Sequence, residues 1–544
     1  MSEGDTKRTP RRRLALLGGG CIVLGYPPFT FFPPLLIVGF ALFLTALGRC
    51  SRRRETFLVG LLFGGAIQLG GFPWLVGTVS RFYRIMPGDT GASESGAFWL
   101  GLGAFVVWWL GSTLGWGLLA LTLRLAPRSP GGRIAGAVLT VLALEMWYPR
   151  IFPWTLGSGF SGWEAWAQFS WWVGVSGLTV VVVAGGGLLA IAWERRNAPG
   201  RGRRWWGGLA GLLAVMTLLG GIRASGDVDL GENPRTLRVG VIQGKISLER
   251  RHSRDRRVRD ALSLEILRRT RALAAAESPD LVIWSEGILS EILGPRDPGL
   301  VDFCRVAGLP MIFGSLGDVG EQISNRAWIS LQPGEVPDYY DKRALMPFGE
   351  QFPAHGFLRS IGIPLPPAAI FPGESVKVFE FKEVKLGPSI CFEGLLPNTA
   401  DDLRRVGAEL HINLTEDLWY GMSGAPHQHL ALTRMRAVEA GLPLVRVTNA
   451  GITVVTDARG RIQERTALGS EIETVYDVAV PGTLASRPVT QVIFRYLHWG
   501  FPAGLVLLLV LRSRARKAAQ ISDSGPNPGD IGTPFRSEEG DSDN

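Results

Sequence analysis

The sequence predicts a multi-pass α-helical membrane bundle joined to an α/β domain that lies outside the membrane. The first indication is composition, because 46% of the 544 residues are hydrophobic and 18 are tryptophan, yet 19% are charged. The second is segregation along the chain. Residues 14–222 are mostly apolar runs, whereas residues 235–486 alternate between short apolar strands and charged helical stretches. One more apolar run follows, so we expect a bundle, a large insert and a final anchor.

Eight apolar runs come near the roughly 20 residues that a helix needs to cross a bilayer. They lie at 14–27, 30–48, 56–78, 97–123, 134–148, 171–193, 206–222 and 492–511. A basic stretch, residues 1–13, precedes them. Residues 518–544 are rich in Gly, Pro, Ser and acidic residues with little to bury, so we expect a disordered tail.

The loop charges predict the orientation of these helices. Clusters of Arg and Lys precede the first run and follow the second, fourth, sixth and eighth. Since basic loops stay in the cytoplasm, both termini are expected there and the 235–486 domain in the periplasm or an equivalent exterior. A cleaved signal at "TPRRRLALLGGGC" is the alternative, and it would leave the domain on the same side. The same loops explain the net charge of +9, so nucleic acid is not an expected partner.

Three residues at predicted strand ends make chemical sense together: Glu286 in "DLVIWSE", Lys342 in "YYDKRALMPFGE" and Cys391 in "KLGPSICFEG". A carboxylate can take the thiol proton, and an ammonium can stabilise a thiolate or an oxyanion. The Phe392 N–H could be a second oxyanion donor. Each residue also has a plainer interpretation: a helix cap, a surface charge and a buried core thiol.

The order of motifs strengthens the catalytic interpretation. "PDLVIWSE", "DKRALMPFGEQFP" and "GPSICFE" resemble the Glu-Lys-Cys motifs of the nitrilase (carbon–nitrogen hydrolase) superfamily, whose fold is a four-layer αββα sandwich. With the apolar runs, "EDLWYG", "PHQHL" and "RVTNAGIT", residues 10–512 resemble the apolipoprotein N-acyltransferase family. That resemblance implies Glu286 as general base, Lys342 as oxyanion-stabilising cation and Cys391 as nucleophile.

It also implies Glu350 and Glu393 as supporting carboxylates. The alternative for Glu350 is an exposed loop acid.

The sequence departs from the family pattern at four places. Phe392 replaces a Tyr, "WSE" at 284–286 replaces "WPE", and "GKISLERRH" at 244–252 replaces a "GNIPQ" segment followed by Trp. Glu416 stands where "NDAWFG" has Asn. These changes put in doubt a hydroxyl hydrogen bond at residue 392 and a lid contact near His252.

Other chemistry-bearing residues are less specific. His427 and His429 have no third ligand at a zinc-site spacing, so no metal and no other cofactor is expected. Trp419 and Tyr420 are candidate lipid-facing residues, with core packing as the alternative. Glu145, an acid inside an apolar run, is a functional residue or a packing partner.

The function implied by the resemblance is lipid chemistry. A phospholipid such as phosphatidylethanolamine would acylate Cys391, and the thioester would pass its acyl group to the α-amine of a diacylglyceryl-apolipoprotein. Loops 350–360 and 415–425 are expected to keep water from the thioester. Two alternatives stay open: a membrane-tethered amidase or nitrilase that hydrolyses a small C–N substrate, and a transporter with an outer regulatory domain.

Overall fold

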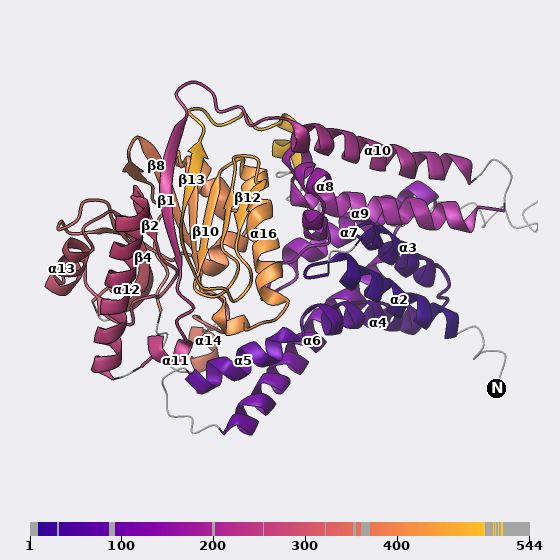
Figure 1. The fold of residues 1–544 in the computed structure, drawn as a ribbon. Coiled ribbons are helices and arrows are strands. Elements are labelled where there is room, and N and C mark those ends of the chain that lie inside the picture. Colours follow the sequence, from indigo (N-terminus) through magenta and orange to yellow (C-terminus); the bar gives the residue numbers. More distant parts are fainter. Residues whose placement is uncertain are drawn as a thin grey trace, which may run out of the picture.

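The computed structural model describes residues 9–29, 32–85, 93–197, 202–253, 255–320, 322–351, 355–360 and 370–494, with 504, 506, 510, 513 and 514. Figure 1 shows a helical half, drawn from indigo to magenta, beside a half that contains two β-sheets. The predicted fold class, apolar helices joined to an α/β domain, is confirmed.

The helical half follows the predicted apolar runs closely. Its helices are α2 (Thr9–Gly25), α3 (Leu35–Gly48), α4 (Arg53–Gly71), α5 (Trp74–Ile85), α6 (Glu94–Leu123), α7 (Pro130–Trp147), α8 (Glu164–Gln168), α9 (Ser170–Glu194) and α10 (Arg203–Ser225), with a 3-10 turn, η1 (Gly157–Gly162). Their apolar side chains share one cluster that includes Phe40, Phe63 and Trp116.

Three of the described helices, α6, α9 and α10, are long and apolar enough to cross a membrane. A fourth span results if α4 and α5 count as one, although they meet at a 55° bend. The bend lies at Phe72 and Pro73, inside the predicted run 56–78, because proline cannot continue the hydrogen-bond ladder of a helix. Most of 492–511 lies outside the described residues, as do 518–544 and part of the basic N-terminus.

The α/β half contains two sheets with parallel strands at their centres. The first has the order β13-β1-β2-β4-β5-β6, with β3 beside β4; the second has the order β12-β11-β10-β9-β8-β7. First-sheet bounds are β1 (Arg235–Gln243), β2 (Leu281–Ile283), β3 (Ile292–Leu293), β4 (Met311–Asp318), β5 (Ile323–Ser330), β6 (Asp338–Asp341) and β13 (Ile472–Val480). Second-sheet bounds are β7 (Phe379–Phe381), β8 (Val384–Ile390), β9 (Leu410–Thr415), β10 (Leu444–Thr448), β11 (Val454–Thr456) and β12 (Ile462–Arg465).

The two sheets pack face to face, with helices on both outer faces. Val239 and Ile283 of the first sheet share an apolar cluster with Ile412 and Val445 of the second. The helices are α11 (Leu248–Arg251), α12 (Arg256–Glu277), α13 (Pro298–Ala307), α14 (His355–Ser360), α15 (Thr399–Arg405) and α16 (Ala425–Ala440), with 3-10 turns η2 (Cys391–Leu395) and η3 (Leu418–Tyr420). In Figure 1, α12 and α13 cover the first sheet and α16 the second, which gives the four αββα layers.

Helix α16 lies between the second sheet and the helical half (Figure 1), so it is buried on almost every side. Its polar residues are paired across that interface, as burial requires. Gln428 donates to the carbonyl oxygens of Pro27 (3.0 Å) and Gly71 (2.8 Å), and its own oxygen accepts the Trp74 indole N–H (3.1 Å). Gln428 therefore fastens the α4–α5 bend to the α/β half.

Candidate active site

The three predicted residues meet at one edge of the sandwich. Glu286 follows β2, Lys342 follows β6 and Cys391 follows β8. Strands β2 and β6 run in the same direction within the first sheet, so their carboxyl ends reach the same edge, and β8 of the second sheet ends close to them. The Lys342 Nζ lies 3.3 Å from Glu286 Oε1, and both charges act on the Cys391 thiol. Lys342 is 1% exposed, and Glu286 and Cys391 are 8% exposed each.

Glu350 completes the surroundings of Lys342 and is not an exposed acid. Its carboxylate lies 2.8 Å from Lys342 Nζ and accepts the Met346 N–H at 2.8 Å. The Asn325 amide, on β5, donates to Glu286 and to Glu350, each at 2.8 Å. Asn325 thus bridges the two carboxylates that flank the lysine. The sequence offered no motif for it, because β5 mixes polar and apolar residues and Asn325 is one polar residue among several.

Glu393 holds the turn that presents the thiol. Cys391 has a φ of +50°, a left-handed conformation that a residue with a Cβ rarely adopts. The Glu393 carboxylate, 2% exposed, accepts the Ile390 N–H at 2.8 Å on one side of the turn. On the other side it accepts the Arg343 N–H at 2.7 Å, next to Lys342. One carboxylate therefore fixes the thiol and the ammonium relative to each other.

The electrostatics favour a neutral thiol in the resting site. Burial raises the pKa of Cys391 well above its usual value, Glu286 adds to the rise, and the charge of Lys342 opposes it. For Lys342, burial opposes the charge, but Glu350, Glu286 and Cys391 outweigh burial and hold its pKa well above the usual range. The site thus combines a buried ammonium group, a carboxyl group and a thiol that favours its protonated form.

A buried ion-pair network supports the site from the second sheet. Asp417 lies 2.9 Å from Arg446 and 2.9 Å from His429 Nδ1, and both residues are inaccessible to solvent. Burial acts to raise the pKa of Asp417, but Arg446 and His429 lower it to about 2. His429 is thus held by Asp417 through its Nδ1. Arg446 begins the "RVTNAGIT" motif, but its buried pairing with Asp417 could not be predicted from that motif.

Two family models match this chain. Residues 268–486 match the carbon-nitrogen hydrolase model and residues 18–188 match the apolipoprotein N-acyltransferase N-terminal domain. The apolipoprotein N-acyltransferase of Caulobacter vibrioides is 30% identical over 532 residues, 91% of this chain and 92% of that protein. This chain belongs to the apolipoprotein N-acyltransferase family.

Other relatives agree in length and name. The apolipoprotein N-acyltransferase of Rhizobium rhizogenes is 28% identical and covers 93% of this chain and 96% of its own length. Among solved structures, an amidase from Nesterenkonia sp. is 19% identical, with a TM-score of 0.35 over 44% of this chain and 90% of that chain. A glutamine-dependent NAD+ synthetase from Acinetobacter baumannii is 17% identical, with a TM-score of 0.35 over 47% and 48%.

Aromatic residues form the wall of the site toward the helical half. Tyr420 is 4% exposed and packs edge-on against Trp74, with ring centroids 5.3 Å apart, so it is a buried wall residue and does not lie on a lipid-facing surface. Trp419 is partly exposed and contacts His252 at 5.5 Å. The His252 ring therefore makes an aromatic contact with Trp419. Phe392 is buried in the apolar cluster of the helical half, so packing replaces the missing hydroxyl.

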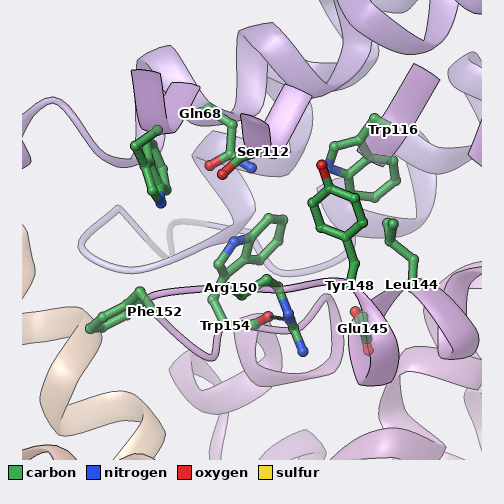
Figure 2. A pocket seen from close by; sticks show the side chains of 10 residues that line it. Gln68, Ser112, Trp116, Leu144, Glu145, Tyr148, Arg150, Phe152 and Trp154 are labelled. Atoms are coloured by element: carbon green, nitrogen blue, oxygen red, sulfur yellow. Dashed lines mark hydrogen bonds between the residues drawn. The ribbon is translucent and has the colours of Figure 1, made fainter. Parts of the chain in front are cut away.

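Glu145 is a packing partner in the helical half. Its carboxylate accepts the Leu156 N–H at 2.7 Å and the Thr179 hydroxyl at 2.9 Å. It also lines a cavity of about 30 Å³, room for roughly two water molecules. Figure 2 shows the residues around it: Gln68, Trp108, Ser112, Trp116, Leu144, Glu145, Tyr148, Arg150, Phe152 and Trp154. Phe152, which lines the cavity, packs against Trp74, and Trp74 packs against Tyr420.

Proposed function

We propose that this chain transfers a fatty acyl group from a phospholipid to the α-amine of an S-diacylglyceryl cysteine at the N-terminus of an apolipoprotein. Family membership supports the acceptor, because the full-length relatives are named apolipoprotein N-acyltransferase. The observation that carries the chemistry is the buried meeting of Glu286, Lys342 and Cys391 beside the helical half.

In the first half-reaction, Glu286 accepts the Cys391 thiol proton while Sγ attacks the acyl ester carbonyl of the phospholipid. Lys342 Nζ and the Phe392 N–H stabilise the tetrahedral oxyanion. The intermediate collapses, the ester C–O bond breaks, and Glu286 returns the proton to the departing lysophospholipid oxygen. An acyl thioester on Cys391 remains.

In the second half-reaction, the lipoprotein α-amine attacks the thioester carbonyl. Glu286 takes a proton from the amine, and the same two donors hold the oxyanion. The C–S bond breaks, an amide forms, and the thiolate of Cys391 regains its proton from Glu286. Supporting roles follow from the contacts: Glu350 holds Lys342, and Glu393 holds the Cys391 turn.

The helical half has a physical reason to be part of this enzyme. Both lipid substrates keep their chains in the bilayer, and lifting a chain into water costs about 0.8 kcal/mol per methylene. A site next to membrane helices avoids that cost. We propose phosphatidylethanolamine as the donor, and an inner-membrane location with residues 14–222 and 492–511 in the bilayer, 235–486 in the periplasm and both termini in the cytoplasm.

We propose that the two loops 350–360 and 415–425 exclude water from the thioester. The second contains η3, and residues 352–354 of the first lie outside the described residues.

The test is a transfer assay on the purified protein in phosphatidylethanolamine vesicles. A synthetic diacylglyceryl peptide with a free α-amine should gain one acyl group, while the same peptide with an acetylated amine should gain none. Cys391→Ala should abolish the gain. Release of free fatty acid without peptide acylation would support a tethered hydrolase instead.

A further inference from the structure

A buried ion pair, outside the three proposed catalytic residues, lies directly behind Glu286. Arg251 ends α11 and Glu416 follows β9, and their side chains pair with 5% and 3% of their areas exposed. The Glu416 carboxylate also accepts the Leu418 N–H at 2.7 Å and the Asn449 amide at 3.1 Å. Such a pair is seldom kept for stability alone, because desolvation offsets much of the attraction.

The pair hydrogen-bonds to Glu286 at two places, its backbone oxygen and its side-chain carboxylate. Arg251 donates to the backbone oxygen of Glu286 at 2.9 Å and to that of Gly287 at 2.8 Å. The backbone N–H of Glu416 donates to Glu286 Oε2 at 3.0 Å. The other oxygen, Oε1, faces Lys342 and Asn325.

Position 287, beside the Arg251 guanidinium, favours glycine. Gly287 has a φ of +54°, and a Cβ there would lie 2.6 Å from Arg251 Nη2. Backbone and ion pair are thus fitted to each other.

Both partners stand where the sequence departs from the family pattern. Arg251 lies in "GKISLERRH", and Glu416 replaces the Asn of "NDAWFG". The guanidinium of Arg251 and the carboxylate of Glu416 are in contact.

We propose that the Arg251–Glu416 pair positions Glu286 and keeps the net charge behind it at zero. This inference rests on the proposed role of Glu286 as the general base. Arg251 and Glu416 are positioning residues, because they act through Glu286 and not on the substrate.

The charged and titratable groups that face Glu286 come from five segments. Lys342 follows β6, Cys391 follows β8, Tyr420 lies in η3, and the ion pair completes the set. Beyond Lys342 lies Glu350. Burial lowers the pKa of Arg251 to about 10, with Glu286 opposing the fall, so the guanidinium stays charged at neutral pH.

The two halves of the pair should therefore have opposite effects on Glu286. Arg251→Met leaves the Glu416 carboxylate uncompensated, and its negative charge disfavours the ionised form of Glu286. Glu416→Gln leaves the guanidinium uncompensated, which favours the ionised form, while the backbone N–H to Glu286 is kept. Because the base must be ionised to act, the acidic limb of the pH–rate profile should move up in the first variant and down in the second, each by about one pH unit.

The experiment measures the rate of acyl-enzyme formation on the full-length protein in phosphatidylethanolamine vesicles between pH 5 and 9. The readout is the hydroxylamine-labile mass gain per unit time. The double variant Arg251→Met/Glu416→Gln should return the limb to within about 0.3 unit of wild type. Its maximal rate should be reduced, because the hydrogen bonds from Arg251 to the backbone oxygens of Glu286 and Gly287 are lost. Arg251→Lys keeps the charge, so its limb should stay in place.

The matched control is Arg250→Met. Arg250 adjoins Arg251 but forms a half-exposed pair with Glu265 at 2.8 Å, so the same substitution there should not move the limb. The inference would be overturned if the limbs of Arg251→Met and Glu416→Gln moved in the same direction, or if both stayed within about 0.3 unit of wild type. A shifted limb in Arg251→Lys would also overturn it, and this test holds even if Arg251→Met or Glu416→Gln fails to fold. Absence of any acyl-enzyme in wild type would instead overturn the proposed function.

Discussion

Replacement of Glu393 by glutamine tests how the Cys391 turn is held. The carboxylate accepts four donors: the Tyr340 hydroxyl (2.9 Å) and the backbone N–H groups of Arg343 (2.7 Å), Ala344 (3.0 Å) and Ile390 (2.8 Å). Burial raises the pKa of Glu393, whereas these N–H groups and Lys342 oppose the rise. Four donors fit an ionised carboxylate, which can only accept.

The cost can be worked out from the two orientations of the amide. In the better one, the glutamine oxygen keeps Tyr340, Arg343 and Ala344, and its NH2 group faces the Ile390 N–H. One charge-assisted hydrogen bond is lost and one buried N–H is left without an acceptor, together about 3 kcal/mol. For a domain of this size, that lowers Tm by roughly 6–12 °C.

Tryptophan fluorescence during heating in detergent would measure the change, with the acyl-enzyme rate as a second readout. The turn loosens at Cys391, so the rate should fall together with Tm. The control is Glu464→Gln on the exposed β12, which should leave both unchanged. A Tm within about 2 °C of wild type would show that the Glu393 carboxyl is protonated in the native state, and would refute the reasoning.

Three further predictions concern the thiol, the ion-pair network and the interface. Since the pKa of Cys391 is raised, its alkylation by iodoacetamide should keep accelerating up to pH 9; a plateau below pH 7 would indicate a resting thiolate. Asp417, with a folded pKa of about 2 against an ordinary 3.8, contributes about 2 kcal/mol that is present above pH 4 and lost as pH falls toward 2. Asp417→Asn should remove that dependence in acid unfolding and, by stranding Arg446, cost about 3–5 kcal/mol at neutral pH; an unaltered acid profile would contradict this. Gln428→Leu leaves the Trp74 indole and the carbonyls of Pro27 and Gly71 without their partner, so it should lower the free energy of unfolding by about 2–4 kcal/mol and lower Tm with it. An unchanged Tm would show that water replaces the amide.

The site residues that could be predicted best from the sequence are those that follow a strand. Glu286, Lys342 and Cys391 each come directly after a short apolar run, and parallel strands bring such positions to one edge. The two-part fold was also predictable, because membrane helices and a sandwich core differ in the length and spacing of their apolar residues. The bend in the run 56–78 could have been predicted as well, since Pro73 marks it.

Contacts between distant segments could not be predicted. Asn325 bridges Glu286 and Glu350 from a strand that has no motif, and Arg251 meets Glu416 across 165 positions of sequence, 416 − 251. Such pairs depend on how the two sheets and α11 are placed relative to one another. Tyr420 shows the same limit: an aromatic residue in a loop can face lipid or Trp74, and only the packing of α5 against η3 decides.

The central claim, an acyl group carried on Cys391, is tested most directly by the intact mass of the protein. Wild type and Cys391→Ala would be purified, incubated with phosphatidylethanolamine vesicles and weighed before and after hydroxylamine treatment. The account predicts a hydroxylamine-labile gain of one fatty acyl group in wild type only, discharged when a diacylglyceryl peptide is added. No gain in wild type, with ammonia released from small amides instead, would contradict it.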